Sequence, residues 1–206
     1  MPGDAMTILA IDTSTTRGSV ALLDGDAVLL DETFTADRSH GTELVPVLQR
    51  ALGIATAPDV IAVGLGPGSY AGVRIAIATA MGLGMARGAR LVGIPSVASL
   101  ETEAVEYLAV GDARRETFYF TRVDGGRCLE GPLLLGADEL HARLAQWEKL
   151  PVLAPELLAS VPRAVVARPL APGLARLARA GISIAAEGAL EPLYLREPHI
   201  TRPKAR

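Results

Sequence analysis

The segment GLGPGSYAGVRIA, residues 64–76, decides how the first half of the chain folds. It follows an apolar run, 59–65, with the pattern of a buried parallel strand. After the glycine loop we expect a helix from about Tyr70 to Arg87 and then a short strand, 90–94. A strand, a glycine loop, a helix and a second strand in this order predict a βαβ unit.

The glycine loop has part of the spacing used to hold phosphate groups. Gly66, Gly68 and Ala71 satisfy the loose dinucleotide pattern G-x-G-x-x-G/A between a strand and a helix. Pro67 removes one N–H donor, and the acidic residue expected about 20 positions later is missing. Ser69 can cap the following helix, whose N-terminus suits an anion. Gly66, Gly68 and Ser69 are therefore candidate phosphate contacts, and a dinucleotide-binding module is kept as an alternative.

The helix after the loop has a small residue at every fourth position: Gly72, Ala76, Ala80, Gly84 and Gly88. Each glycine inside a helix costs about 1 kcal/mol relative to alanine, so several together need a compensating gain. A smooth ridge of small residues gives one because it lets another backbone approach closely. The ridge packs either on the chain's own sheet and first helix or, in part, on another subunit.

Three strands are predicted before the loop. Apolar runs at 7–12, 19–23 and 27–33 are separated by a polar turn at 12–16 and a strong hairpin turn at 24–26. This arrangement predicts an antiparallel meander.

The polar turn DTSTT, residues 12–16, has two interpretations that the residues leave open. Its hydroxyl and N–H groups can donate to a phosphate, and its acid can position a magnesium-bound water. Alternatively, the side chains satisfy the backbone of their own turn. The candidate phosphate contacts in this turn are Asp12, Thr13, Ser14 and Thr15.

The remaining regular segments are predicted from periodicity and turn signals. They are a helix at 39–50, a strand at 107–111, two strands around a turn at 124–126, and helices at 137–147 and 173–180. Pro46 makes the first of these helices kinked or late in starting, and the tail from 191 onward is expected to be extended. Both halves place hairpin strands before helices, as do the duplicated lobes of the actin and hexokinase class. We expect an α/β fold with lobes at 1–105 and 106–206, the second shortened.

Composition excludes several classes of protein. The chain has 206 residues, half of them hydrophobic, and a net charge of −3, unlike a strongly basic nucleic-acid binder. No apolar run approaches the roughly 20 residues of a membrane span, and we do not expect Met1 to Thr7 to belong to a signal peptide. Cys128 is the only cysteine, so a reducing cytoplasm is expected. His40, His141 and His199 lack the spacing of metal ligands.

Six segments in order carry a more specific signal. They are ILAIDTSTTRGSVALLDGD, RSHGTELVPVL, GLGPGSYAGVRIAIATAMGLG, LVGIPSVASLE, GDARRETFY and PLYLRE. Together they resemble the bacterial TsaB (YeaZ) family over nearly the whole chain, best over 8–100 and least over 151–188.

That resemblance implies an actin-like subunit of the machinery that makes N6-threonylcarbamoyladenosine in tRNA, next to the anticodon. The catalytic subunit is then a paralogue, TsaD, with TsaE as an ATPase and TsaC or a relative making the adenylate. ATP, magnesium and metal belong to those partners, and tRNA is met only through the complex. Ser96 and Leu100 stand where the catalytic paralogue has two metal-binding histidines. Since leucine cannot ligate a metal, this chain is expected to have no metal and no transfer activity of its own.

The resemblance also implies a helical interface with TsaD, or with a second copy of this chain. Its candidate residues are His40, Leu44, Leu48, Gly72, Ile75, Ala76, Thr79, Ala80, Leu83 and Gly84. Tryptophan at Ala76 or Ala80 is then expected to block association while the monomer still folds. Rival interpretations are an actin-like small-molecule kinase, which would use the polar turn, and a metalloprotease, which lacks ligands.

Overall fold

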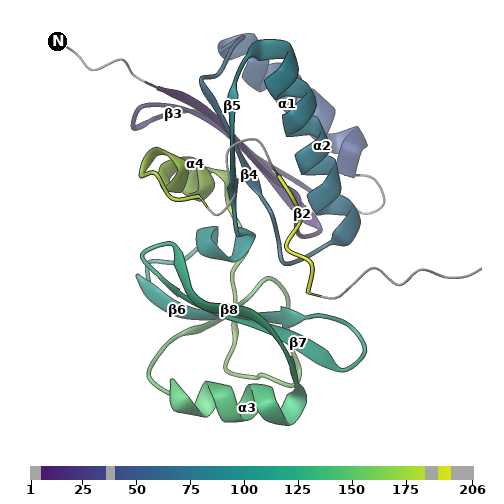
Figure 1. Ribbon diagram of the computed structural model, residues 1–206, viewed down its shortest axis with the longest axis vertical. Coiled ribbons are helices and arrows are strands. Elements are labelled where there is room, and N and C mark those ends of the chain that lie inside the picture. Colours follow the sequence, from purple (N-terminus) through teal and green to yellow (C-terminus); the bar gives the residue numbers. More distant parts are fainter. Residues whose placement is uncertain (1–5, 36–39, 184–189, 196–206) are drawn as a thin grey trace, which may run out of the picture.

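The described residues form two five-stranded sheets, one in each lobe (Figure 1). Residues 6–35, 40–183 and 190–195 are described by the computed structural model, with the backbone alone at His40. The first sheet has the strand order β3-β2-β1-β4-β5. Its strands are β1 (Thr7–Asp12), β2 (Arg17–Asp24), β3 (Ala27–Thr35), β4 (Val60–Gly64) and β5 (Arg90–Ile94). The first three are antiparallel, and β4 and β5 run parallel to β1, which confirms the predicted meander and βαβ unit.

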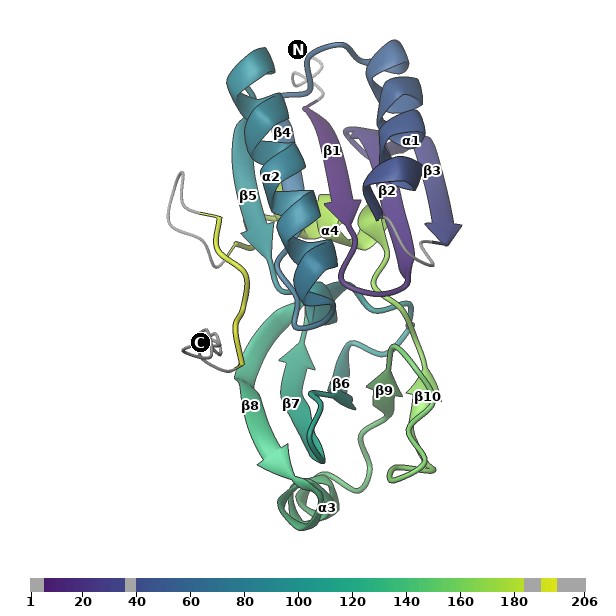
Figure 2. The ribbon, with the colours of Figure 1, turned by 90° about the vertical axis from the view of Figure 1, so that its right-hand side faces the viewer.

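Helices cover both faces of the first sheet. α1 (His40–Ile54) and α2 (Tyr70–Arg87) lie side by side on one face (Figure 2), and α4 (Ala171–Arg179) lies on the other. Strand β1 alternates accordingly, with Leu9 in the cluster under α1 and α2 and Ile8 in the cluster under α4. This two-sided burial explains why the central strands are continuous apolar runs.

Helix α1 begins before its proline and ends later than predicted. It continues through Pro46 to Ile54 instead of ending at Arg50. Leu44 and Leu48 face the core, as the apolar periodicity predicted. The predicted cap Ser39 lies outside the described residues.

The second sheet repeats the topology of the first. Its order is β10-β9-β6-β7-β8, with an antiparallel meander followed by two parallel strands. Its strands are β6 (Glu106–Asp112), β7 (Thr117–Asp124), β8 (Arg127–Gly136), β9 (Val152–Ala154) and β10 (Val165–Val166). α3 (Ala137–Gln146) covers its outer face through Leu140 and Leu144. Residues 155–164, all described, contain no counterpart of α2. The predicted two-lobed, actin-like fold with a shortened second lobe is confirmed.

The second sheet begins at Glu106, where the second lobe was predicted to start, and the chain that follows this sheet returns to the first lobe. α4 packs on β1 and β2 of the first lobe, and Ala171 N–H donates to Ser19 Oγ over 2.9 Å. Leu190 is also part of the first-lobe core. An amphipathic helix is recognisable from sequence, but its periodicity does not say which sheet it covers.

Residues 190–195, which we call the strap, run from the first lobe to the second. The strap contains no helix or strand, in agreement with the predicted extended tail, whose remainder lies outside the described residues. No helix in the described ranges is long and apolar enough to cross a bilayer.

Candidate functional site

The polar turn and the glycine loop lie against each other where the first lobe meets the second. Asp12, Thr13 and Ser14 are fully buried or nearly so. Asp12 Oδ1 accepts bonds from Ser14 N–H over 2.8 Å and from Ser14 Oγ over 2.7 Å. The acid therefore braces its own turn, which is the second of the two interpretations made from the sequence.

The glycines of the loop are needed because this turn packs on them. A methyl group added at Gly68 would collide with the Ser14 carbonyl oxygen, and one added at Gly72 with that of Thr13. Thr13 Oγ1 also donates to the Gly72 carbonyl over 2.7 Å. The absence of side chains at Gly68 and Gly72 thus lets two backbones meet.

Two N–H donors of the glycine loop that were expected to hold a phosphate are already used within the chain. Gly66 N–H donates to Ser96 Oγ over 3.0 Å, and Ser69 N–H donates to the Ser14 carbonyl over 2.6 Å. Ser69 caps α2 as predicted, since its Oγ accepts from Gly72 N–H over 3.2 Å. The structure brings the predicted polar residues together, but as an internal packing contact. Their binding of phosphate stays a prediction.

Ser96 and Leu100, which the family resemblance aligns with two histidines of the catalytic paralogue, have structural contacts of their own. Ser96 is buried in a short 3-10 helix, η1 (Ser96–Ser99), and its own N–H donates to the Gly66 carbonyl over 2.8 Å. Leu100 packs in the core of the second lobe. Among the described residues, no three His, Cys, Asp or Glu side chains are grouped to hold a metal. The expectation of no metal stays a prediction.

Ser96→Ala is expected to lower the free energy of unfolding by about 1–3 kcal/mol, because it leaves the buried Gly66 N–H without its acceptor. Urea titration followed by circular dichroism measures the change. Ser160→Ala, on the partly exposed surface of the second lobe, is the control and should change stability by less than about 0.5 kcal/mol. Equal effects of the two substitutions would contradict this role of Ser96.

The groups between the lobes that can ionise are poorly suited to act as nucleophiles. Burial, with smaller contributions from the nearby Glu156 and Asp12 carboxylates, raises the pKa of Tyr119 well above its usual range. Burial likewise raises the pKa of the Cys128 thiol to about 11, which leaves little thiolate near neutral pH. Tyr107 Oη donates to the Val97 carbonyl over 2.7 Å and so joins the second sheet to η1.

The predicted ridge of small residues faces the chain's own core. Ala76 and Ala80 are fully buried, and Gly72 and Gly84 are buried on the same side of α2. Leu44 and Leu48 of α1 are buried as well. These six residues cannot meet a partner without unfolding the lobe, so this part of the predicted interface is wrong. Ile75, Thr79 and Leu83 are half-buried at its border, and the side chain of His40 lies outside the described residues.

A different face of α2 is exposed, and we call it the outer helix face. On α1, Val45 and Ile54 are also exposed, but they are nine residues apart and so lie on opposite sides of that helix. The large apolar side chains of the outer helix face are Tyr70, Met81 and Met85, with exposed fractions from 42% for Met81 to 89% for Met85. The small residues Ala71, Ala78 and Gly82 of α2 lie exposed among them. In the sequence, successive spacings of seven, three and four separate Ala71, Ala78, Met81 and Met85. These spacings indicate a second apolar stripe on α2.

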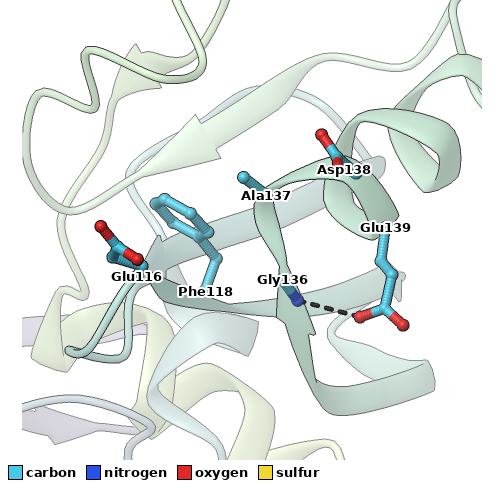
Figure 3. A pocket seen from close by; sticks show the side chains of 6 residues that line it. All are labelled: Glu116, Phe118, Gly136, Ala137, Asp138 and Glu139. Atoms are coloured by element: carbon cyan, nitrogen blue, oxygen red, sulfur yellow. Dashed lines mark hydrogen bonds between the residues drawn. The ribbon is translucent and has the colours of Figure 1, made fainter.

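A separate cleft of about 620 Å³ lies at the N-terminus of α3 (Figure 3). It is lined by Phe118 and by the carboxylates of Glu116, Asp138 and Glu139. The Glu139 carboxylate accepts a hydrogen bond from Gly136 N–H over 2.9 Å. This capping contact accounts for a glutamate in the first turn of α3. The neighbouring Arg114 has a positive φ of 65°, in a hairpin turn that Asp112 braces through Arg114 N–H.

Comparison with known proteins agrees with this architecture. A family model described as TsaD, tRNA N6-adenosine threonylcarbamoyltransferase, matches residues 34–187, about three-quarters of the chain. The tRNA threonylcarbamoyladenosine biosynthesis protein TsaB of Escherichia coli is 29% identical over 93% of this chain and 95% of its own. The chain belongs to the TsaB (YeaZ) branch of this family. An uncharacterised relative from Mycobacterium bovis is 34% identical over 93% of this chain and 92% of its own.

Solved structures of the same branch have the same fold. YeaZ from Pseudomonas aeruginosa superposes with a TM-score of 0.72 at 27% identity and covers 92% of this chain and all of its own. A second Pseudomonas aeruginosa protein, described as similar to peptidase YeaZ, gives a TM-score of 0.74 at 29% identity. The similarity to each of these structures therefore extends over at least 92% of this chain.

Proposed function

We propose that this chain is a subunit, without catalytic activity of its own, of the complex that forms N6-threonylcarbamoyladenosine in tRNA. In this proposal it binds the catalytic paralogue TsaD and makes it competent for transfer. Membership of the TsaB branch supports the pathway, because relatives of that branch carry the name of this biosynthesis. The net charge of −3 suits a protein that meets tRNA only through its complex.

The observation that carries the docking role is the outer helix face. Monomeric proteins rarely expose contiguous apolar surface without a use for it. Here Met81 and Met85 lie exposed on one stripe of α2, with small side chains between them that let another helix approach closely. The sheet beneath supplies a rigid support for this two-helix layer.

The contact between turn and loop supports the absence of catalysis. The Gly66 and Ser69 N–H groups, which a phosphate would need, donate within the chain, and Asp12 braces its own turn. Ser96 holds the loop and Leu100 fills the core, so neither resembles a metal ligand. ATP, magnesium and any metal then belong to the partner subunits, including a TsaE-type ATPase.

Reconstitution tests the proposal. Purified TsaD, TsaE, an adenylate-forming enzyme, ATP, threonine, bicarbonate and unmodified tRNA are combined with and without this chain, and the modified nucleoside is quantified by mass spectrometry. We expect its formation to depend on this chain. With the adenylate and tRNA alone, the chain should give none. Undiminished formation after omission, or transfer by this chain unaided, would overturn the proposal.

When no partner is present, the same face can pair two copies of this chain. We therefore expect free protein to self-associate through α1 and α2, and TsaD to dissociate that homodimer. Sedimentation velocity with increasing TsaD distinguishes the species by mass. A homodimer that persists inside the complex would show that the two contacts use different surfaces.

A further inference from the structure

Tyr70, Arg74 and Tyr194 form an exposed cluster at the start of α2, which we call the aromatic cluster. The Tyr70 and Tyr194 rings lie 5.6 Å apart between centroids, and the Arg74 guanidinium carbon lies 5.1 Å from the Tyr70 ring centre. Arg74 also donates a hydrogen bond to Tyr70 Oη. Tyr70 and Tyr194 nevertheless remain 53% and 47% exposed. The three side chains are held together while about half of each ring is left for another molecule.

The strap fixes Tyr194 in this position. Leu193 N–H donates to the Leu65 carbonyl over 2.9 Å, and its side chain packs on the first-lobe core. Leu190 is buried in that same core, whereas Leu195 packs against the core of the second lobe. The backbone on both sides of Tyr194 is therefore anchored. Little conformational entropy is lost when a partner binds this side chain.

The chemistry of the cluster favours a protein partner with a carboxylate. Tyrosine and arginine are enriched among the residues that dominate binding energy at interfaces. α2 contains no aspartate or glutamate, and Arg74 is the cation on its outer helix face, since Arg87 is thirteen residues further on and lies on the other side of the helix. A second copy laid α2 against α2 offers Arg74 no opposite charge and pairs more weakly than a non-identical helix that presents a carboxylate.

We propose that the aromatic cluster anchors the outer helix face to a non-identical protein partner. That partner presents a carboxylate to Arg74 and an apolar side chain to the two tyrosine rings. The inference rests on the proposed function, in which this partner is the catalytic paralogue, and it adds the strap to the docking surface. Because Tyr194 belongs to the strap, docking also steadies the packing between the lobes.

Titration calorimetry of the full-length chain with TsaD tests the anchor. Tyr194→Ala and Arg74→Gln are each expected to weaken binding by about tenfold, the effect of losing a dominant contact. Tyr194→Phe keeps the ring and should retain most of the affinity. Leu157→Ala, an exposed apolar residue in the second lobe, is the control and should bind as wild type. Thermal melts establish that each variant folds.

The outcomes separate this inference from the function on which it rests. If wild type does not bind TsaD, both fail. If wild type binds and the Tyr194→Ala and Arg74→Gln variants bind equally well, or more tightly, the anchor is overturned while the function stands. If these substitutions weaken the homodimer but leave TsaD binding unchanged, the occupant is a second copy and the inference is again overturned. Slower hydrogen exchange at the Leu193 amide on TsaD binding is the expected sign of the link through the strap.

Discussion

Ala78→Trp is expected to weaken binding of the proposed TsaD partner by about a hundredfold while the protein folds normally. Ala78 is exposed in the middle of α2, between Arg74 and Met81 on the outer helix face. An indole there holds the two helical layers apart. Overpacking of a close contact costs about 1–3 kcal/mol, and the upper end of that range corresponds to this loss of affinity. Titration calorimetry gives the affinity, and thermal unfolding gives the stability.

Two matched substitutions control for the bulk of tryptophan. Ala142→Trp puts the same side chain on the exposed surface of α3 and should leave both affinity and stability unchanged. Ala76→Trp lies two residues from Ala78 but points into the fully packed core, so it should prevent stable folding. Wild-type binding by Ala78→Trp would place the partner on another surface.

The order of elements was predictable because each one has a local signal. Alternating polar turns and apolar runs located the meander at 7–33, and the glycine loop after a buried strand located α2. The same signals recur after residue 106, which is why two lobes were expected. The sequence did not predict which sheet α4 packs against. Its apolar stripe fits any sheet of suitable shape, and the contact with the first sheet is a property of the tertiary structure.

The predicted ridge of small residues and the proposed docking surface lie on different sides of α2. Small residues at every fourth position indicate that a backbone approaches closely, and they carry no information about whose backbone it is. In α2 the approaching backbone is that of the polar turn at Gly72, and at Ala76 and Ala80 it is the helix's own sheet and α1 layer. The exposed stripe through Met81 and Met85 was less conspicuous, since exposure is a property of the fold.

The candidate phosphate contacts show a similar limit. The turn at 12–16 was recognised as a polar segment rich in hydroxyl groups, and the loop at 66–69 as a glycine-rich segment after a buried parallel strand. Whether their N–H groups were free for a ligand depended on the contact between them, which joins residues more than 50 positions apart. The sequence drew attention to Ser96 only because it has no imidazole to bind a metal. The hydrogen bond that its Oγ accepts from Gly66 N–H became visible only in the structure.

Gly72→Ala is expected to destabilise the protein by about 3 kcal/mol, the upper range for overpacking a filled interior. Alanine is the better helix former by about 1 kcal/mol, so helix propensity alone predicts the opposite sign. The new methyl group would collide with the Thr13 carbonyl oxygen, which belongs to backbone and cannot rotate away. Relief of the collision moves the turn from α2 and breaks the 2.7 Å bond from Thr13 Oγ1 to the Gly72 carbonyl.

Gly82→Ala is the matched control, because it makes the same change ten residues further along the same helix. Apart from the neighbouring backbone of the helix itself, no atom lies within 4 Å of the position that its methyl group would take. Gly82→Ala should therefore stabilise the free protein by about 0.5–1 kcal/mol, as measured by urea unfolding beside Gly72→Ala. Opposite signs at the two sites would establish that Gly72 serves the contact between the turn and the loop. Stabilisation by both substitutions would mean that the polar turn can move away from α2 at little energetic cost. The glycine loop would then still have room to open for an anion.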